Sequence, residues 1–258
     1  MEFEKFKTKI KNGKVINNNV LFNNDSLDIM QKMIDNNIKV NSIITDPPYN
    51  ISRKNNFHTL KSGKGDLKYR QGIDFGEWDK KFDLYNWIDL GIELLDKNGS
   101  MVIFNDWKNI GNIARYAESQ NMLIKDMIRF EKTNPMPRNI DRRYVTDFEV
   151  AVWLVKKGAK WVFNRQDEKY QRCKFSGAII SKSEKVDGGH PTQKPLWLME
   201  EIIKIHTNED DIVLDPFSGS FTTGVACNNL NRKFIGMELE EKYFNIGLKR
   251  LSKSGLVK

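Results

Sequence analysis

Residues 211–223 read DIVLDPFSGSFTT, a short apolar run followed by a turn of small residues. The apolar run predicts a buried strand, and the turn predicts the start of a helix. A second apolar run, KFIGM at 233–237, is followed by Glu238, which lies 19 residues after Gly219. Nucleotide-binding βαβ units place a ribose-binding carboxylate at about this distance from their glycine turn. The segment therefore predicts a βαβ unit with a nucleotide-type ligand at the ends of its strands.

The turn after the first of these strands lacks the G-x-G-x-x-G pattern. That pattern brings backbone amides against a pyrophosphate, so its absence argues against a dinucleotide ligand. A nucleoside without phosphates fits the segment better. An ordinary βαβ turn followed by a surface glutamate is the alternative interpretation.

A third apolar run, VNSIIT at 40–45, ends in Asp46-Pro47-Pro48-Tyr49. The two prolines stiffen the backbone that carries the carboxylate, and an aromatic ring follows directly. A rigid acceptor beside a ring can hold a flat base through its amino group. The alternative is a strand-ending turn with an incidental tyrosine, because X-Pro-Pro is common in loops. If both strands belong to one parallel sheet, their ligand groups lie along one edge of it.

Apolar periodicity in the rest of the chain predicts alternating strands and helices, which is typical of a mostly parallel sheet. Ser26 is the expected cap of one helix, and Pro195 the expected start of another. A third helix is expected to end at Asn98-Gly99. Further strands are expected at 20–22, 100–104, 122–130 and 148–155, and Trp87, Trp107, Trp153 and Trp161 are expected to be packing residues.

Together these segments resemble the beta group of DNA adenine-N6 methyltransferases, amino-methyltransferases that use S-adenosylmethionine (SAM). The family's D-P-P-Y motif matches residues 46–49, and its D-P-F-x-G-S-G-T-T motif matches residues 215–223 except at Phe221. The catalytic motif precedes the SAM motif, as in the beta group, and the resemblance extends over nearly the whole chain. Three shorter family motifs are matched by NDSL at 24–27, KTNPMP at 132–137 and HPTQKP at 190–195.

The resemblance implies an α/β, Rossmann-like SAM-dependent methyltransferase fold, with a mostly parallel sheet flanked by helices. Its motif order is circularly permuted, and a small insertion supplies target recognition. Residues 1–137 would form the catalytic half of the domain, including a mobile basic loop at about 51–77. Residues 138–189 would form the target-recognition region, and residues 190–258 the SAM-binding half.

The implied reaction transfers the SAM methyl group to the N6 amino group of an adenine flipped out of double-stranded DNA. The Asp46 carboxylate and the Pro47 carbonyl would accept the two N6 hydrogens. Pro48 would stiffen this backbone, and Tyr49 would stack on the base. Glu238 would bind the ribose hydroxyls of the cofactor. The other expected cofactor-binding residues are Asp25, Asp215, Pro216, Phe217, Gly219, Ser220, His190, Thr192 and Lys194.

Phe221 departs from the family pattern, which has a third glycine at this position. A bulky residue there must tolerate the local backbone angles. The ring is expected either to cover the cofactor or to weaken its binding. Phe221→Gly is accordingly expected to preserve or improve SAM binding.

The net charge of +8 is unevenly distributed along the chain. Residues 51–70 carry +5 and residues 156–185 carry +6, so the other residues carry −3. A solvated lysine-rich surface is the ordinary explanation, but beside a base-modifying site these segments favour binding to DNA phosphates. The expected DNA-binding residues are Arg53, Lys54, Lys61, Lys64, Lys68, Asn134, Arg138, Arg142 and Arg143.

Other functions stay open: cytosine-N4 methylation, which usually has Ser in place of Asp46, RNA adenine methylation, and DNA binding by a catalytically weak relative. Cys173 and Cys227 lack metal-ligand or disulfide spacing, so free thiols and no metal site are expected. No apolar stretch approaches about 18 residues, which predicts a soluble, intracellular protein. The resemblance implies a cytoplasmic enzyme that is bacterial or phage-encoded. A second copy of the chain and a cognate restriction endonuclease are further candidate partners.

Overall fold

The computed structural model describes residues 6, 13–50, 56–60, 67–71, 82–136, 141, 144–167, 169–181, 184–185 and 192–254, with backbone alone for 56–60 and 67–71. Within these ranges nine strands form one sheet in the order β1-β2-β11-β10-β3-β6-β8-β7-β9, and β4 and β5 pair separately. The strands are β1 (Lys14–Ile16), β2 (Asn19–Phe22), β3 (Val40–Thr45), β4 (Asn56–Leu60), β5 (Leu67–Gln71), β6 (Leu95–Asn105), β7 (Met122–Lys132), β8 (Phe148–Lys156), β9 (Lys174–Gly177), β10 (Ile212–Asp215) and β11 (Lys233–Met237).

The centre of the large sheet is parallel, with β2, β11, β10, β3 and β6 running in one direction. β8 is antiparallel to both β6 and β7. β10 and β3 pair directly, with Leu214 opposite Ile43, so strands from the two ends of the chain finish side by side. This arrangement confirms the expected Rossmann-like, mostly parallel sheet.

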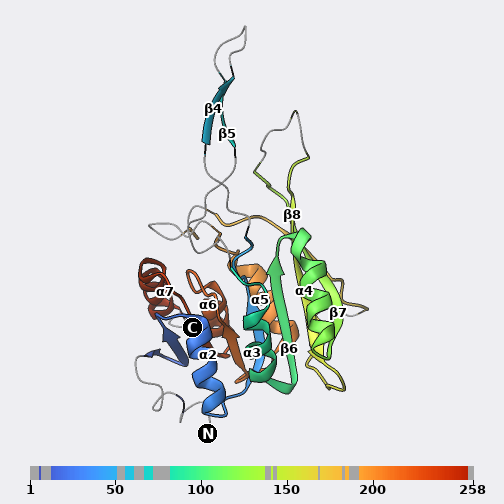
Figure 1. The fold of residues 1–258 in the computed structure, drawn as a ribbon, viewed down its shortest axis with the longest axis vertical. Coiled ribbons are helices and arrows are strands. Elements are labelled where there is room, and N and C mark those ends of the chain that lie inside the picture. Colours follow the sequence, from blue (N-terminus) through green and yellow to red (C-terminus); the bar gives the residue numbers. More distant parts are fainter. Residues whose placement is uncertain are drawn as a thin grey trace.

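Helices cover both faces of the large sheet (Figure 1). The layer with α2, α3 and α4 packs on a hydrophobic cluster that includes Met30, Trp87 and Ile113. The layer with α5, α6 and α7 packs on a second cluster that includes Ile202 and Leu251. Within the described ranges, no helix has the length and apolar character needed to cross a membrane. The helices are α2 (Ser26–Asp35), α3 (Asn86–Leu94), α4 (Trp107–Ser119), α5 (Leu196–His206), α6 (Thr222–Asn229) and α7 (Glu241–Lys253).

The cap of α2 differs from the expectation. Asp25, not Ser26, is the N-cap, and its Oδ1 accepts a hydrogen bond from the Leu27 N–H at 2.8 Å. Both residue types are good caps, so composition could not choose between neighbours. The cap fixes Asp25 at the end of β2, where the sheet edge meets the ligand site.

Two further expectations are wrong. Helix α3 ends at Leu94 and β6 begins at once, so Asn98-Gly99 lie inside a strand and do not end the helix. A Cβ at Gly99 would lie 2.7 Å from the Asn41 carbonyl oxygen, so glycine is needed here for close strand approach. Trp107 is 63% exposed and is not a core residue, in contrast to Trp87.

Part of the expected basic loop at 51–77 is a two-stranded ribbon. β4 and β5 pair antiparallel, with His58 opposite Tyr69 and Thr59 opposite Lys68. Figure 1 shows this ribbon standing off the end of the sheet that carries the connection between β7 and β8. The sequence of this segment is rich in glycine and lysine and has little apolar periodicity, so pattern alone did not predict its strands.

Candidate active site

A cavity of about 420 Å³ opens at the carboxyl ends of β2, β3, β10 and β11. This volume lies within the range of about 300–1,000 Å³ that small-molecule sites occupy. Both ends of the chain contribute to its wall, so the permuted motifs meet at one site. The sequence-predicted residues that line it are Asp25, Asp46, Pro48, Thr192, Lys194, Asp215, Pro216, Phe217, Gly219, Ser220 and Glu238.

The buried carboxylate of Asp215 joins the two central strands. Its Oδ1 accepts hydrogen bonds from Thr45 Oγ1 at 2.6 Å and from the Phe217 N–H at 3.2 Å. Its Oδ2 accepts one from Thr223 Oγ1 at 2.7 Å. Burial raises the pKa of this carboxyl to about 6. Because Thr45 directly precedes Asp46, Asp215 ties the turn after β10 to the D-P-P-Y motif.

Glu238 closes the turn from the neighbouring strand. Gly219 has φ of +52°, a conformation that favours glycine, and its N–H donates to Glu238 Oε2 at 2.8 Å. The Glu240 N–H donates to Oε1 at 2.8 Å. Each carboxylate oxygen keeps a lone pair with which it can accept from a ligand hydroxyl. Burial raises the pKa of Glu238 to about 7.

An apolar wall completes the cavity on the side of α3. The Phe217 ring packs edge-on against Phe82 and Trp87, with ring centroids 5.2 and 5.3 Å apart. Gln193 also lines the cavity, and its Oε1 is buried without a hydrogen-bond partner among the described residues. A carboxylate that can accept from hydroxyls, an apolar wall and an unsatisfied amide oxygen fit the adenosine and amino groups of SAM.

Phe221 does not line this cavity. Its backbone is left-handed, with φ of +57°, and its side chain is fully buried. The ring packs edge-on against Phe234 and Phe244, at centroid distances of 6.1 and 5.8 Å. A Cβ at Gly247 would lie 1.6 Å from Phe221 Cδ2, so the ring occupies space that Gly247 leaves. The ring therefore neither covers the cofactor site nor fills it.

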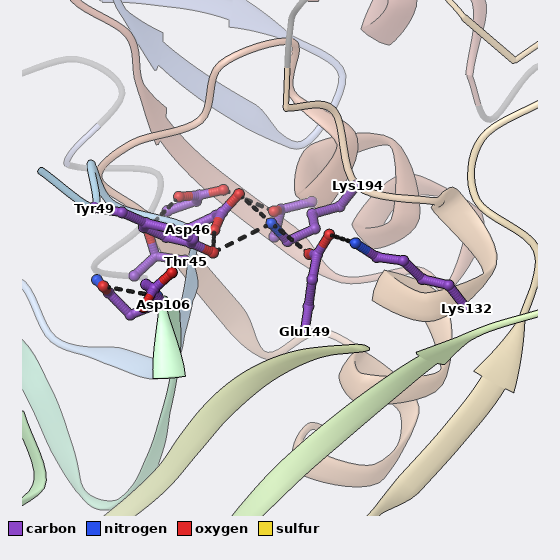
Figure 2. Close-up of polar contacts among 10 residues, drawn as sticks. Thr45, Asp46, Tyr49, Asp106, Lys132, Glu149 and Lys194 are labelled. Atoms are coloured by element: carbon purple, nitrogen blue, oxygen red, sulfur yellow. Dashed lines mark hydrogen bonds and ion pairs between the residues drawn. The ribbon is translucent and has the colours of Figure 1, made fainter. Parts of the chain in front are cut away.

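Asp46 lies where the cavity meets a group of charged side chains, shown in Figure 2. Its Oδ1 accepts a hydrogen bond from the Tyr49 hydroxyl, and its Oδ2 accepts one from Lys194 Nζ at 2.5 Å. The same Nζ lies 3.1 Å from Glu149 Oε2. Lys132 Nζ contacts the other oxygen of Glu149 at 2.8 Å. Carboxylates and ammonium groups thus alternate across the ends of β3, β8 and β7.

Burial and the neighbouring opposite charges both shift the pKa values of Asp46, Lys194 and Glu149. Burial raises the pKa of Asp46, and Lys194 opposes that rise. Burial disfavours the ammonium of Lys194, but Asp46 and Glu149 outweigh it and raise the pKa of Lys194. Burial also acts on Glu149, yet Lys194 and Lys132 lower its pKa to about 2. Lys194 therefore stays a cation between two carboxylates at neutral pH.

A side chain of α4 fixes the backbone of the D-P-P-Y motif. Asn109 Nδ2 donates to the Tyr49 carbonyl oxygen at 2.9 Å and to Asn105 Oδ1 at 2.8 Å. Asp106 caps the same helix by accepting from the Lys108 N–H at 3.0 Å. The turn after β3 is thereby fixed to the end of β6.

Sequence reasoning missed several of these residues, namely Glu149, Lys132, Asn109 and Gln193. Glu149 had a detectable signal, because it is the single charge within the run FEVAVWLV at 148–155. An acid inside an apolar strand costs free energy unless it is paired, so it marks a buried interaction. Lys132 is the first residue of the KTNPMP motif at 132–137, but the motif alone does not identify its partner, which is distant in sequence.

Most of the expected DNA-binding residues lie outside the described ranges. Asn134 is exposed, and its Oδ1 accepts a hydrogen bond from the Ile179 N–H at 2.8 Å, which ties the end of β7 to the segment after β9. Lys68 lies in β5, for which the backbone alone is described. The residues outside the described ranges are Arg53, Lys54, Lys61, Lys64, Arg138, Arg142 and Arg143, together with the cofactor candidate His190.

Comparison with known proteins identifies the family of this chain. The model of the N6/N4 DNA methylase family matches residues 40–249. The Type II methyltransferase M2.LlaDCHI of Lactococcus lactis subsp. cremoris is 34% identical, over 92% of this chain and 90% of that protein. The Type II methyltransferase M2.DpnII of Streptococcus pneumoniae is 35% identical, over 91% of this chain and 90% of that protein.

Solved structures give the same result. The crystal structure of M1.HpyAVI in complex with SAM is 44% identical, covers 90% of this chain and 98% of its own, and superposes with a TM-score of 0.72. The cytosine-N4-specific PvuII DNA methyltransferase shares the fold at 18% identity, with 92% and 87% of the two chains covered and a TM-score of 0.66. Family match, related sequences and cavity together show that this chain is a SAM-dependent DNA methyltransferase and belongs to the N6/N4 DNA methylase family.

Proposed function

We propose that this enzyme methylates the N6 amino group of an adenine flipped out of double-stranded DNA. One observation carries the proposal: the Asp46 carboxylate, at the start of a stiff Pro-Pro turn, lines the same cavity as the turn after β10. An acceptor for an amino group therefore adjoins the cofactor site. When bound, SAM supplies an electrophilic methyl group on a sulfonium.

The residues of the motif would correct the weak nucleophilicity of the amino nitrogen. Its lone pair is delocalised into the adenine ring, so it attacks poorly while the group stays planar. Acceptance of one N6 hydrogen by Asp46 and the other by the Pro47 carbonyl favours a pyramidal nitrogen that points at the methyl group. The base must leave the duplex for in-line attack, which costs a few kcal/mol of unstacking. Tyr49 would stack on the extruded base.

The acid at position 46 favours adenine over cytosine, because the N4-methylating members that the sequence resembles usually carry Ser there. The test is incorporation of labelled methyl groups from SAM into unmethylated duplex DNA and into RNA, followed by nucleoside analysis. N6-methyladenine in DNA supports the proposal. N4-methylcytosine, methylation of RNA alone, or no transfer would each contradict it.

We expect Glu238→Ala to raise the SAM dissociation constant about 10 to 100-fold. The substitution would remove one or two charge-assisted hydrogen bonds between the Glu238 carboxylate and the ribose hydroxyls of SAM, which are worth ~1.5–3 kcal/mol. Titration calorimetry measures the change. Glu241→Gln is the matched control, because it removes an exposed acid of the neighbouring helix start that does not line the cavity. An unchanged SAM affinity in Glu238→Ala would show that other residues bind the ribose hydroxyls.

The same site predicts a pH dependence of SAM binding. Burial raises the pKa of Glu238 to about 7, and hydroxyl donors favour its carboxylate form, so binding is linked to proton release. Affinity should therefore fall as pH decreases below 7, by about tenfold at pH 6 relative to the plateau at high pH. Glu238→Gln, which does not titrate, should lose this dependence.

We propose that the lysines of the basic segment 51–70 and the arginines at 138–143 bind DNA in different ways. Neutralising Lys61, Lys64 and Lys68 together should weaken binding to all duplexes about equally. The salt dependence should flatten by up to ~0.9 for each phosphate that the variant no longer neutralises. Affinities for randomised duplexes at several salt concentrations provide the measurement.

Arg138, Arg142 and Arg143 should instead affect discrimination between sites. An arginine that reads a guanine edge contributes ~1–3 kcal/mol of discrimination. Methylation rates on the same duplex panel separate the two roles. Altered sequence preference in the lysine variant, with unchanged preference in the arginine variants, would reverse the assignment.

The division of the chain into catalytic residues 1–137, target-recognition residues 138–189 and SAM-binding residues 190–258 belongs to this proposal. So do a second copy of the chain and a cognate restriction endonuclease as partners. The Type II methyltransferase names of the relatives support the endonuclease. Sedimentation of the enzyme with and without duplex DNA tests for the homodimer.

A further inference from the structure

In this structure both oxygens of Asp46 accept hydrogen bonds from the protein. The Tyr49 hydroxyl donates to Oδ1, and the Lys194 ammonium donates to Oδ2 at 2.5 Å. If Asp46 also accepts a hydrogen from a target amino group, that group competes with one of these donors. A charged donor binds a carboxylate more strongly than a neutral amino group does. The ammonium must therefore have another acceptor available when the base arrives.

Glu149 is that acceptor. Its Oε2 lies 3.1 Å from Lys194 Nζ on the side away from Asp46, as Figure 2 shows. Lys132 Nζ lies 2.8 Å from its other oxygen, and the backbone of Glu149 pairs with Phe130 of β7, so Glu149 is fixed in place. Lys194 needs only a small displacement to pass from one carboxylate to the other. The side chain of Lys194 is 9% exposed, so water offers little competition for the ammonium.

We infer that Lys194 is a positioning residue that occupies the amine-accepting oxygen of Asp46 between turnovers and moves to Glu149 when the target amino group binds. This inference rests on the proposed role of Asp46 toward the target amine. Lys194 thereby holds the Asp46 carboxylate in place and keeps it ionised before the base enters. Glu149 acts by pairing with the Lys194 ammonium after it leaves Asp46. In this role, neither Lys194 nor Glu149 contacts the cofactor.

The electrostatics of the cluster support this role. Asp46 is taken out of water, which favours its protonated and inactive form, while the neighbouring ammonium favours the carboxylate. Glu149 acts on Asp46 in the opposite direction, because it is a second negative charge nearby. Removing Lys194 and removing Glu149 should therefore shift the titration of Asp46 in opposite directions. The charged and titratable groups around Asp46 and Lys194 are Tyr49 after β3, Glu149 on β8, Lys132 on β7, Asp106 at the start of α4 and Asp215 on β10.

The test measures pH profiles of kcat/KM for Lys194→Met and Glu149→Gln against the wild-type enzyme. In Lys194→Met the acidic limb should move upward by about one pH unit or more, because an opposite charge close to a carboxyl shifts its pKa by about 1–3 units. In Glu149→Gln the limb should move downward. KM for DNA should rise in that variant, because the ammonium then stays on Asp46. Limbs that coincide with the wild-type limb in both variants would overturn the inference.

Lys157→Met is the matched control, since it removes an exposed lysine from the turn after β8 and should leave the limb unchanged. Circular dichroism and SAM titration establish that each variant is folded and binds cofactor. Lys194→Arg retains the charge and should keep the limb close to that of the wild type. A uniform loss of activity at every pH in Lys194→Met, with an unmoved limb, would indicate a merely structural lysine.

A measurement that does not depend on turnover separates this inference from the proposed function. Carbon-13 NMR of the aspartate carboxyls, with the Asp46 signal assigned through Asp46→Asn, follows the titration of Asp46 in the enzyme alone. The pKa should be higher in Lys194→Met and lower in Glu149→Gln than in the wild type. If nucleoside analysis finds no N6-methyladenine but these shifts occur, the proposed target fails and the placement of Lys194 stands. If N6-methyladenine forms and the shifts do not occur, the inference alone fails.

Discussion

Asp46→Ala should reduce methyl transfer by about 10³-fold or more while SAM affinity changes little. The loss follows from removal of a preorganised acceptor that acts on the target amino group, for which single deletions cost about 10²–10³ in kcat. An additional loss is expected because the Lys194 ammonium, left with Glu149 as its carboxylate partner, keeps its positive charge close to the target amino group. SAM affinity should survive because Glu238 and the turn at Gly219 are held to each other and not to Asp46. Single-turnover methylation and calorimetric SAM titration measure the two effects separately.

Asp46→Asn is the informative companion to this variant. It keeps the size of the side chain and one acceptor oxygen, but its amide nitrogen would point hydrogens at Tyr49 or Lys194. Transfer should remain strongly impaired, and pairing of Lys194 with Glu149 should strengthen. An equal loss of SAM affinity in the alanine and asparagine variants would move Asp46 from the target side of the site to the cofactor side.

Phe221→Gly should destabilise the fold by about 1–4 kcal/mol. Loss of a large buried aromatic side chain costs roughly 3–5 kcal/mol, and relief of a left-handed backbone at a non-glycine residue returns roughly 1–2 kcal/mol. This outcome replaces the expectation that the substitution mainly concerns SAM. The ring is fully buried against Phe234 and Phe244, away from the cavity. Urea unfolding monitored by circular dichroism measures the change in the free energy of unfolding.

Phe221→Leu controls for volume and should lose less stability than the glycine variant. The SAM affinity of folded Phe221→Gly should stay within about threefold of the wild type, because Ser220 and Gly219 provide the cavity wall. A large loss of SAM affinity without loss of stability would show that the ring belongs to the cofactor site after all.

The strand ends were predictable because motif residues directly follow apolar runs, and parallel strands bring such ends together. Asp46, Asp215 and Glu238 illustrate this, since each follows or ends a strand that the pattern identifies. The same reasoning could not show that the Asp215 carboxylate accepts hydrogen bonds from Thr45 and Thr223. Such partners depend on the directions of side chains across neighbouring strands, which the linear pattern does not give.

Other features depend on tertiary context that a linear pattern does not carry. Lys194 belongs to a recognisable motif, but its pairing with Asp46 requires α5 to begin beside β3. Lys132 and Glu149 meet only because β7 and β8 pair antiparallel. A family pattern compares Phe221 with a glycine at the same position, whereas the fit of the ring is decided by Gly247 on another helix.

The packing of Phe221 on Gly247 restricts the order in which mutations could have accumulated. A side chain at position 247 would collide with the ring, since its Cβ would lie 1.6 Å from Phe221 Cδ2. An ancestor with glycine at 221 could acquire phenylalanine only after position 247 had become glycine. Once the ring is in place, Gly247 is no longer free to vary. Grafting Phe221 alone into a related enzyme that has a larger residue at position 247 should therefore fail where grafting the pair succeeds, whereas Gly247 alone meets no such collision.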